Sequence, residues 1–138
     1  MELTLESLIR SARAAVIKGC LGLQRGCLAP AFVHPDGSPC AISAALSPAT
    51  RELIRADGNE RLSWLELKCE GYFELAPDLA LIEALATLQI GYDRCFDADP
   101  DIRARRKERF LAYILTLDPD RPPRVWPSEI SMHSLWED

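Results

Sequence analysis

The most apolar stretch of the chain predicts a buried central helix. Residues 79–92 read LALIEALATLQIGY, with Glu83 as the single charged side chain. A helix that is apolar around most of its circumference has to be surrounded by other elements. We therefore expect the fold to pack around residues 79–92, with Glu83 on the side that faces solvent or an arginine. The large apolar side chains at helical spacing are Leu81, Ile82, Leu85, Leu88 and Tyr92.

Two amphipathic segments predict the helices that cover this centre. In the first, Thr4 is suited to cap a helix that runs to about Lys18, and Gly19 is suited to end it in a left-handed conformation. In the second, Asp99 followed by Pro100 predicts a helix start, and a short connection makes this helix antiparallel to the central one. The core-facing stripes are Leu5, Leu8, Ile9, Ala12 and Val16 in the first, and Ile102, Phe110, Tyr113, Ile114 and Leu117 in the second.

The middle of the chain contains weaker signals. Ser38-Pro39 and Ser47-Pro48 each place a capping serine before a proline, which predicts two more helix starts, the second ending at Gly58. Residues 62–75 fit a helix through the capping-box spacing of Ser63 and Glu66, but WLELKCE also alternates as a strand of a small β-hairpin would. We favour the helix, and the hairpin stays open as the alternative.

Beyond Asp118 the prolines at 119, 122, 123 and 127 exclude a continuous helix. The pattern thus predicts a mainly α fold, with one domain over residues 1–138 and about five helices around residues 79–92. Residues 118–138 are expected to form an extended tail that packs on the domain or on a partner.

Composition narrows the class of protein. Of 138 residues 48% are hydrophobic and 27% charged, so a core sufficient for one domain can form. The net charge of −5 argues against binding to nucleic acid or a membrane surface, since both select positive proteins. No signal peptide, membrane span or cofactor fingerprint is recognisable, so we expect a cytoplasmic protein without a cofactor. Five cysteines without a C-x-x-C pair indicate reduced thiols.

Four potential zinc ligands, Cys20, Cys27, His34 and Cys40, fall at the spacing C-x6-C-x6-H-x5-C. Their donor atoms suit tetrahedral zinc, although the spacing matches no zinc knuckle. The alternative is that Cys20 and Cys40 pack as small apolar residues at helix ends while His34 lies exposed in a turn. We favour packing over a metal site.

Cys40 is also a candidate nucleophile. A helix that starts at Ser38 would place it in the first turn, where backbone N–H groups lower the pKa of a thiol. His34 would act as the base and Asp36 would orient it. No catalytic signature surrounds these residues, so a buried structural cysteine is favoured.

Two features predict contacts with another molecule. The first is a basic run within the helix that follows Asp99, which we interpret as a solvated face, as a surface for an acidic protein or, least favoured, as a nucleic-acid site. The second is the tail, whose tryptophans either cover the domain or anchor a partner, including a second copy in a homodimer. The candidate partner-binding residues are Arg103, Arg105, Arg106, Lys107, Arg109, Trp126, Leu135 and Trp136.

A short motif follows the first predicted helix. It comprises Gly19 and Cys20, and then DGSPCAISAA over residues 36–45. This DGxPCAxxAA pattern resembles a family of small uncharacterised bacterial domains. The resemblance covers about the first third of the chain and implies a helical, cytoplasmic bacterial domain without an activity to transfer.

The function expected from these observations is binding and not catalysis. A small acidic domain with a basic helix and a tryptophan-bearing tail is typical of bacterial or phage inhibitors, immunity proteins and accessory subunits. The alternative is a thiol- or zinc-dependent enzyme centred on Cys40 and His34.

Overall fold

A computed structural model describes residues 2–127, and the structural statements below concern this part of the chain. It is a mainly helical single domain with five α-helices in the described residues, as the sequence predicts, and it also contains a small two-stranded sheet. The elements are β1 (Glu2–Leu3), α1 (Leu5–Lys18), the 3-10 turn η1 (Ser43–Ala45), α2 (Pro48–Ala56), α3 (Trp64–Cys69), β2 (Glu74–Leu75), α4 (Leu79–Arg94) and α5 (Pro100–Thr116).

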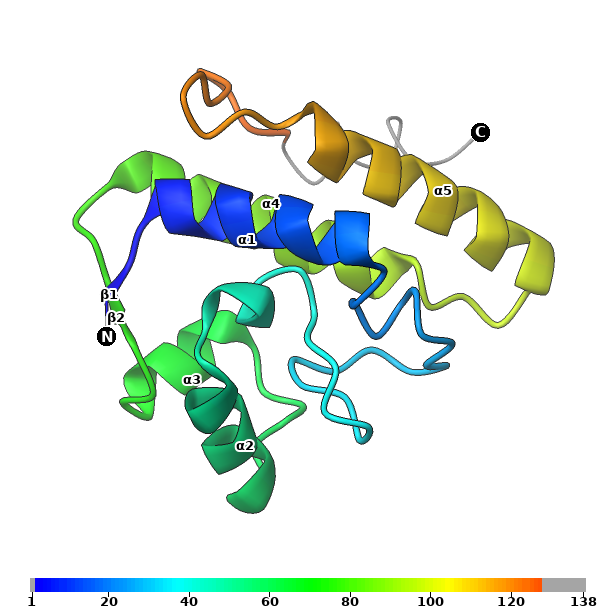
Figure 1. The fold of residues 1–138 in the computed structure, drawn as a ribbon, viewed down its shortest axis with the longest axis horizontal. Coiled ribbons are helices and arrows are strands. Elements are labelled where there is room, and N and C mark those ends of the chain that lie inside the picture. Colours follow the sequence, from blue (N-terminus) through cyan, green and yellow to red (C-terminus); the bar gives the residue numbers. More distant parts are fainter. Residues whose placement is uncertain (1, 128–138) are drawn as a thin grey trace.

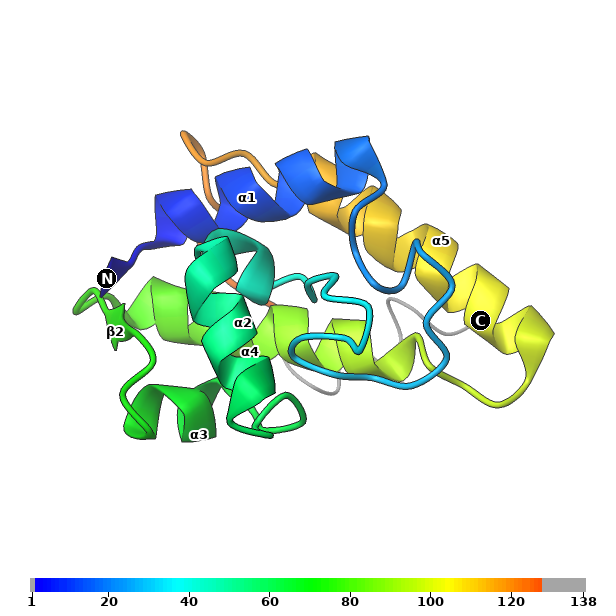
Figure 2. The same cartoon turned by 60° about the horizontal axis from the view of Figure 1, so that its bottom comes forward.

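The three longest helices, α1, α4 and α5, pack against one another (Figure 1), and loops and shorter elements supply the rest of the core. Helix α5 runs back in the direction opposite to α4, and α2 and α3 lie on the other side of α1 and α4 (Figures 1 and 2). Arg13 of α1 fastens the C-terminal end of α5, because its guanidinium donates to the carbonyl oxygen of Leu117 at 2.6 Å. No helix in residues 2–127 is both long and apolar enough to cross a bilayer.

The ends of α1 confirm the predicted caps. The Thr4 hydroxyl accepts a hydrogen bond from the backbone N–H of Ser7, and the Ser7 hydroxyl accepts one from the N–H of Thr4, each at 3.1 Å. Gly19 ends the helix at a φ of 68°, a left-handed conformation that glycine adopts without a Cβ clash. Local capping chemistry therefore decides both boundaries of α1.

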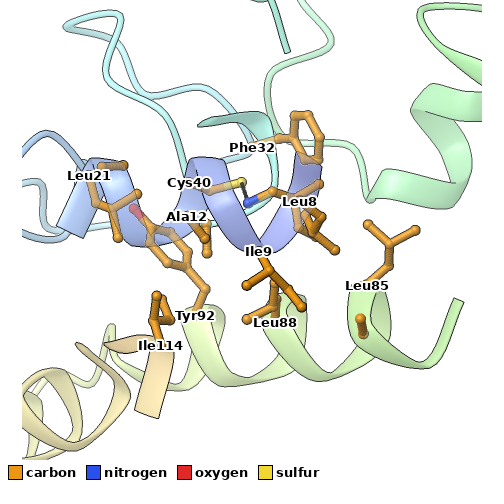
Figure 3. Close-up of a cluster of buried hydrophobic side chains, with 14 of the residues drawn as sticks. Leu8, Ile9, Ala12, Leu21, Phe32, Cys40, Leu85, Leu88, Tyr92 and Ile114 are labelled. Carbon is orange, nitrogen blue, oxygen red and sulfur yellow. Dashed lines mark hydrogen bonds between the residues drawn. The ribbon is translucent and has the colours of Figure 1, made fainter. Parts of the chain in front are cut away.

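The central helix is confirmed with α4, which is longer than predicted by two residues. Its buried face includes Leu81, Leu85, Leu88 and Tyr92. In Figure 3, Leu85, Leu88 and Tyr92 are directed towards α1, and Ile114 of α5 lies beside Tyr92. Ile82 was expected in that face, but it is 37% exposed beside the exposed Glu83. The helix is thus embedded along one broad face and open along a narrower one.

The helix predicted from Ser38 does not form, and only η1 appears in that segment. The carbonyl of Ser38 accepts the N–H of His34 at 2.9 Å, and Pro39 forms an isolated antiparallel bridge with Val33. Ser38 and Pro39 therefore close a tight loop, and their backbone is not free to begin a helix. The other Ser-Pro pair behaves as predicted: Ser47 caps α2 with Pro48 at its first position.

The ambiguous segment of residues 62–75 forms helix α3, capped by Ser63 and Glu66 as the favoured interpretation required. The alternative β-hairpin is wrong. Glu74 and Leu75 are extended, but they pair in parallel with Glu2 and Leu3 at the start of the chain. This long-range pairing carries no local signal in the sequence.

The first part of the tail packs on the domain. The Trp126 side chain is 5% exposed, and the carbonyl of Pro127 accepts a hydrogen bond from the Thr87 hydroxyl of α4 at 3.2 Å. Residues 118–127 thus follow the first of the two alternatives for the tail. Leu135 and Trp136 lie outside the described residues.

Candidate functional site

Cys40 does not occupy the environment of a reactive thiol. Its sulfur accepts backbone N–H groups from Ile42 and Ser43, both at 3.4 Å, as a capping side chain does. Figure 3 marks one hydrogen bond at this sulfur with a dashed line. Cys40 is nevertheless buried, and burial raises the pKa of its thiol despite these bonds. Because the thiolate is the reactive form, a buried thiol with a raised pKa is expected to be inert.

His34 is fully buried and pairs with Tyr92 rather than with Cys40. Its Nε2 atom lies 2.7 Å from the phenolic oxygen of Tyr92, which also accepts the backbone N–H of Leu23 at 3.0 Å. Burial lowers the pKa of His34, although the carboxylate of Asp36 acts in the opposite direction. A neutral imidazole therefore forms part of the core, and its ring packs at a tilt against the rings of Tyr92 and Phe96.

Asp36 does not orient His34, because its carboxylate bonds within its own turn. It accepts the backbone N–H of Ser38 at 2.9 Å and also the Ser38 hydroxyl, which lowers the pKa of Asp36. Arg25 lies 3.6 Å away and adds an exposed ion pair. The three candidate catalytic residues are thus neighbours in sequence without a catalytic hydrogen-bond chain.

The potential zinc ligands are not assembled either. Within residues 2–127, no three His, Cys, Asp or Glu side chains gather in a way that would hold a metal ion. The thiol of Cys20 lies near the carbonyl of Lys18, and that of Cys27 near the hydroxyl of Ser38. The packing interpretation fits the buried Cys40, but its expectation that His34 would lie exposed in a turn is wrong, because His34 is buried in the core.

Some residues of the basic run on α5 bond to the α4–α5 connection, and others do not. Arg103 donates to the carbonyl of Asp97 at 3.1 Å, and Arg106 donates to the carbonyl of Arg94 at 3.0 Å. Arg106 also pairs with the carboxylate of Asp97 at 3.3 Å. These contacts hold the connection between α4 and α5, so part of the run stabilises the fold. Lys107, in contrast, makes no ion pair within residues 2–127.

A groove of about 550 Å³ lies between α5 and the loop that follows α1. Arg103, Lys107 and Leu111 share one face of α5 at intervals of four residues and form one wall. The loop contributes Leu28, which is 73% exposed, and Leu23, which is buried. We call these five residues the α5 groove. It joins apolar surface to two cationic side chains, and the acidic Glu108 also lines it.

The sequence pattern pointed to Arg103 and Lys107 but gave no sign of Leu23 and Leu28. Both leucines lie in an irregular loop without helical or strand periodicity, so no pattern assigns them to a groove. Trp126 was predicted to bind a partner, but its buried ring is not available for such a contact. Its indole N–H has no hydrogen-bond partner among the described residues.

No family model, curated protein or solved structure matches this chain. The resemblance of residues 19–45 to small bacterial domains therefore stays a prediction.

Proposed function

We propose that this chain is a protein-binding protein whose partner docks in the α5 groove. The partner would present an apolar side chain flanked by carboxylates. The apolar side chain would contact Leu28, Leu23 and Leu111, and the carboxylates would lie against Lys107 and Arg103. The role would be that of an inhibitor, immunity protein or accessory subunit in a bacterium or phage, as the sequence analysis expects.

The observation that carries this proposal is the exposure of Leu28 beside Lys107. An isolated exposed leucine needs no explanation, but one that lines a groove with further leucines, Arg103 and Lys107 has the composition of a binding surface. Since the chain carries a net charge of −5, the two cationic side chains, which outnumber the carboxylate of Glu108 in this groove, would also orient an acidic partner during its approach.

The alternative, a thiol enzyme centred on Cys40, has weaker support. His34 bonds to Tyr92, Asp36 bonds to Ser38, and burial raises the pKa of Cys40. The arrangement therefore lacks the base and the activated thiol that this chemistry requires.

The test is retention of a partner from bacterial lysate by four versions of the chain. These are the wild type, Lys107→Glu, Leu28→Asp and Leu79→Asp. Leu79 is the matched control, because it is also 73% exposed but lies at the start of α4, whereas the groove lies by the start of α5. We expect the two groove substitutions to weaken binding about tenfold or more. Leu79→Asp should bind as the wild type does.

A fifth version that ends at Pro127 tests the predicted contribution of Leu135 and Trp136 without removing the buried Trp126. Circular dichroism should show that every version folds. If no protein is retained, or if all versions retain it equally, the α5 groove is not the binding surface.

A further inference from the structure

A second hollow shares no lining residue with the α5 groove. It has a volume of about 200 Å³ and is bounded by residues 30–32, 40–42, 61–66 and the C-terminal half of α4. Phe32, Ile42 and Leu88 give it an apolar lining, next to Tyr92 and Cys40. An engineered cavity of roughly 150 Å³ accepts benzene, and drug-sized ligands occupy roughly 300–1,000 Å³. The hollow therefore suits a ligand of the size of an amino acid.

Two opposite charges line this hollow without a partner. The Asp93 carboxylate and the Arg61 guanidinium make no ion pair or side-chain hydrogen bond in the described part of the chain. Asp93 lies where solvent reaches it, and partial burial in the hollow raises its pKa to about 6. Both side chains are exposed at the rim of an apolar surface, so a ligand can reach them and supply both missing charges.

A third polar group is already oriented. The side-chain oxygen of Gln89 accepts the backbone N–H of Trp64 at 2.9 Å, which fixes the amide and leaves its NH₂ group available. Glu66 also lines the hollow, but one of its oxygens accepts the N–H of Ser63 in the cap of α3. The hollow therefore offers a ligand the Arg61 guanidinium, the Asp93 carboxylate and the NH₂ group of Gln89 around one apolar surface.

From this arrangement we propose that the hollow binds a small zwitterion with an apolar side chain, the chemical class of free leucine or phenylalanine. The ammonium group pairs with Asp93, and the carboxylate pairs with Arg61. The side chain lies against Phe32 and Leu88. No covalent step is involved, and the site acts as a sensor or store for the ligand independently of the α5 groove.

The experiment is isothermal titration calorimetry on the full chain with leucine, phenylalanine and glycine. It also uses two leucine analogues, 3-methylbutylamine, which lacks the carboxylate, and 4-methylpentanoate, which lacks the ammonium group. We expect leucine or phenylalanine to bind more tightly than glycine and than either analogue. Asp93→Asn and Arg61→Gln should each weaken binding of the zwitterion about tenfold, or about 1.4 kcal/mol.

The analogues separate the two charges. The amine should be sensitive to Asp93→Asn but not to Arg61→Gln, and the carboxylate should show the reverse. Lys107→Gln is the matched control in the α5 groove and should leave the affinity unchanged, so failure of this proposal and failure of partner binding are distinguishable. Absence of heat at a ligand concentration of about 10 mM, or an affinity that neither Asp93→Asn nor Arg61→Gln alters, would overturn the proposal.

Discussion

The phenolic oxygen of Tyr92 lies 2.7 Å from Nε2 of His34, although 58 residues separate the two side chains in the sequence. This contact connects the irregular loop after α1 to the C-terminal half of α4, and the N–H of Leu23 adds a second bond to the same oxygen. The loop contributes to both the α5 groove and the second hollow. The buried hydroxyl of Tyr92 therefore holds this loop against α4.

Removal of the hydroxyl in Tyr92→Phe should lower the free energy of unfolding by about 1–3 kcal/mol. The reason is that Leu23 N–H and His34 Nε2 would both remain buried without their partner. Urea denaturation followed by circular dichroism measures the loss. The matched control is Tyr72→Phe, whose hydroxyl donates to Asp57 in an exposed position where water replaces it. An equal loss in the two variants would contradict a special role for the pair.

The stability of the protein should fall as pH decreases through the range in which His34 titrates. Burial lowers the pKa of His34 below 6.5, so the unfolded chain takes up this proton before the folded one. Its contribution is therefore fully present above the unfolded pKa and is lost as pH falls through the folded pKa. His34→Gln should be less stable than wild type at a pH of about 8, with a smaller loss towards a pH of about 5.

The wild-type and His34→Gln proteins are compared by urea denaturation at each pH. The difference between them isolates His34, because other groups titrate in both. Asp93, whose pKa is raised to about 6, acts in the opposite direction and is most favourable when protonated at low pH. A difference that does not change with pH would show that His34 has the same pKa in the folded and unfolded chains.

Gly22→Ala should be among the most destabilising single-methyl additions in this chain. A Cβ at position 22 would lie 2.0 Å from Cδ2 of the His34 ring, which is closely packed and bonded to Tyr92. We expect a loss of about 3 kcal/mol or more, measured by thermal or urea unfolding. The control is Gly19→Ala, which meets nothing within 4 Å but has a φ of 68°, at a cost of about 1 kcal/mol. If Gly22→Ala and Gly19→Ala lost the same free energy of unfolding, backbone conformation and not the clash with His34 would explain both losses.

The five thiols should react at different rates with a thiol reagent in the native protein. Cys69 is exposed and should react as a free thiol does. Cys40 and Cys95 are buried, and burial raises the pKa of both, to about 12 for Cys95, so they should react slowly until urea unfolds the chain. A fast phase that disappears in Cys40→Ala would contradict this and would restore the thiol-enzyme hypothesis.

Short-range signals in the sequence determined most of the helices. Thr4 and Gly19 for α1, Ser47 with Pro48 for α2, and Asp99 for α5 act within one helical turn, so the residues that decide each boundary are adjacent to it. The apolar composition of residues 79–92 likewise predicted a central helix. The same pattern did not predict the exposure of Ile82, because the burial of this side chain depends on which elements pack against that side of α4.

Tertiary structure decided the rest. Ser38-Pro39 and Ser47-Pro48 carry the same local signal, but only the second begins a helix, since the first is held in a loop by His34 and Val33. The α5 groove and the second hollow are also formed by residues that are distant in the chain. A side chain's partner across such a distance depends on the packing of whole elements, whereas a cap depends on its immediate neighbours. For this reason the sequence alone determined where most helices begin and end, and only the folded chain determined which residues face each other across a surface.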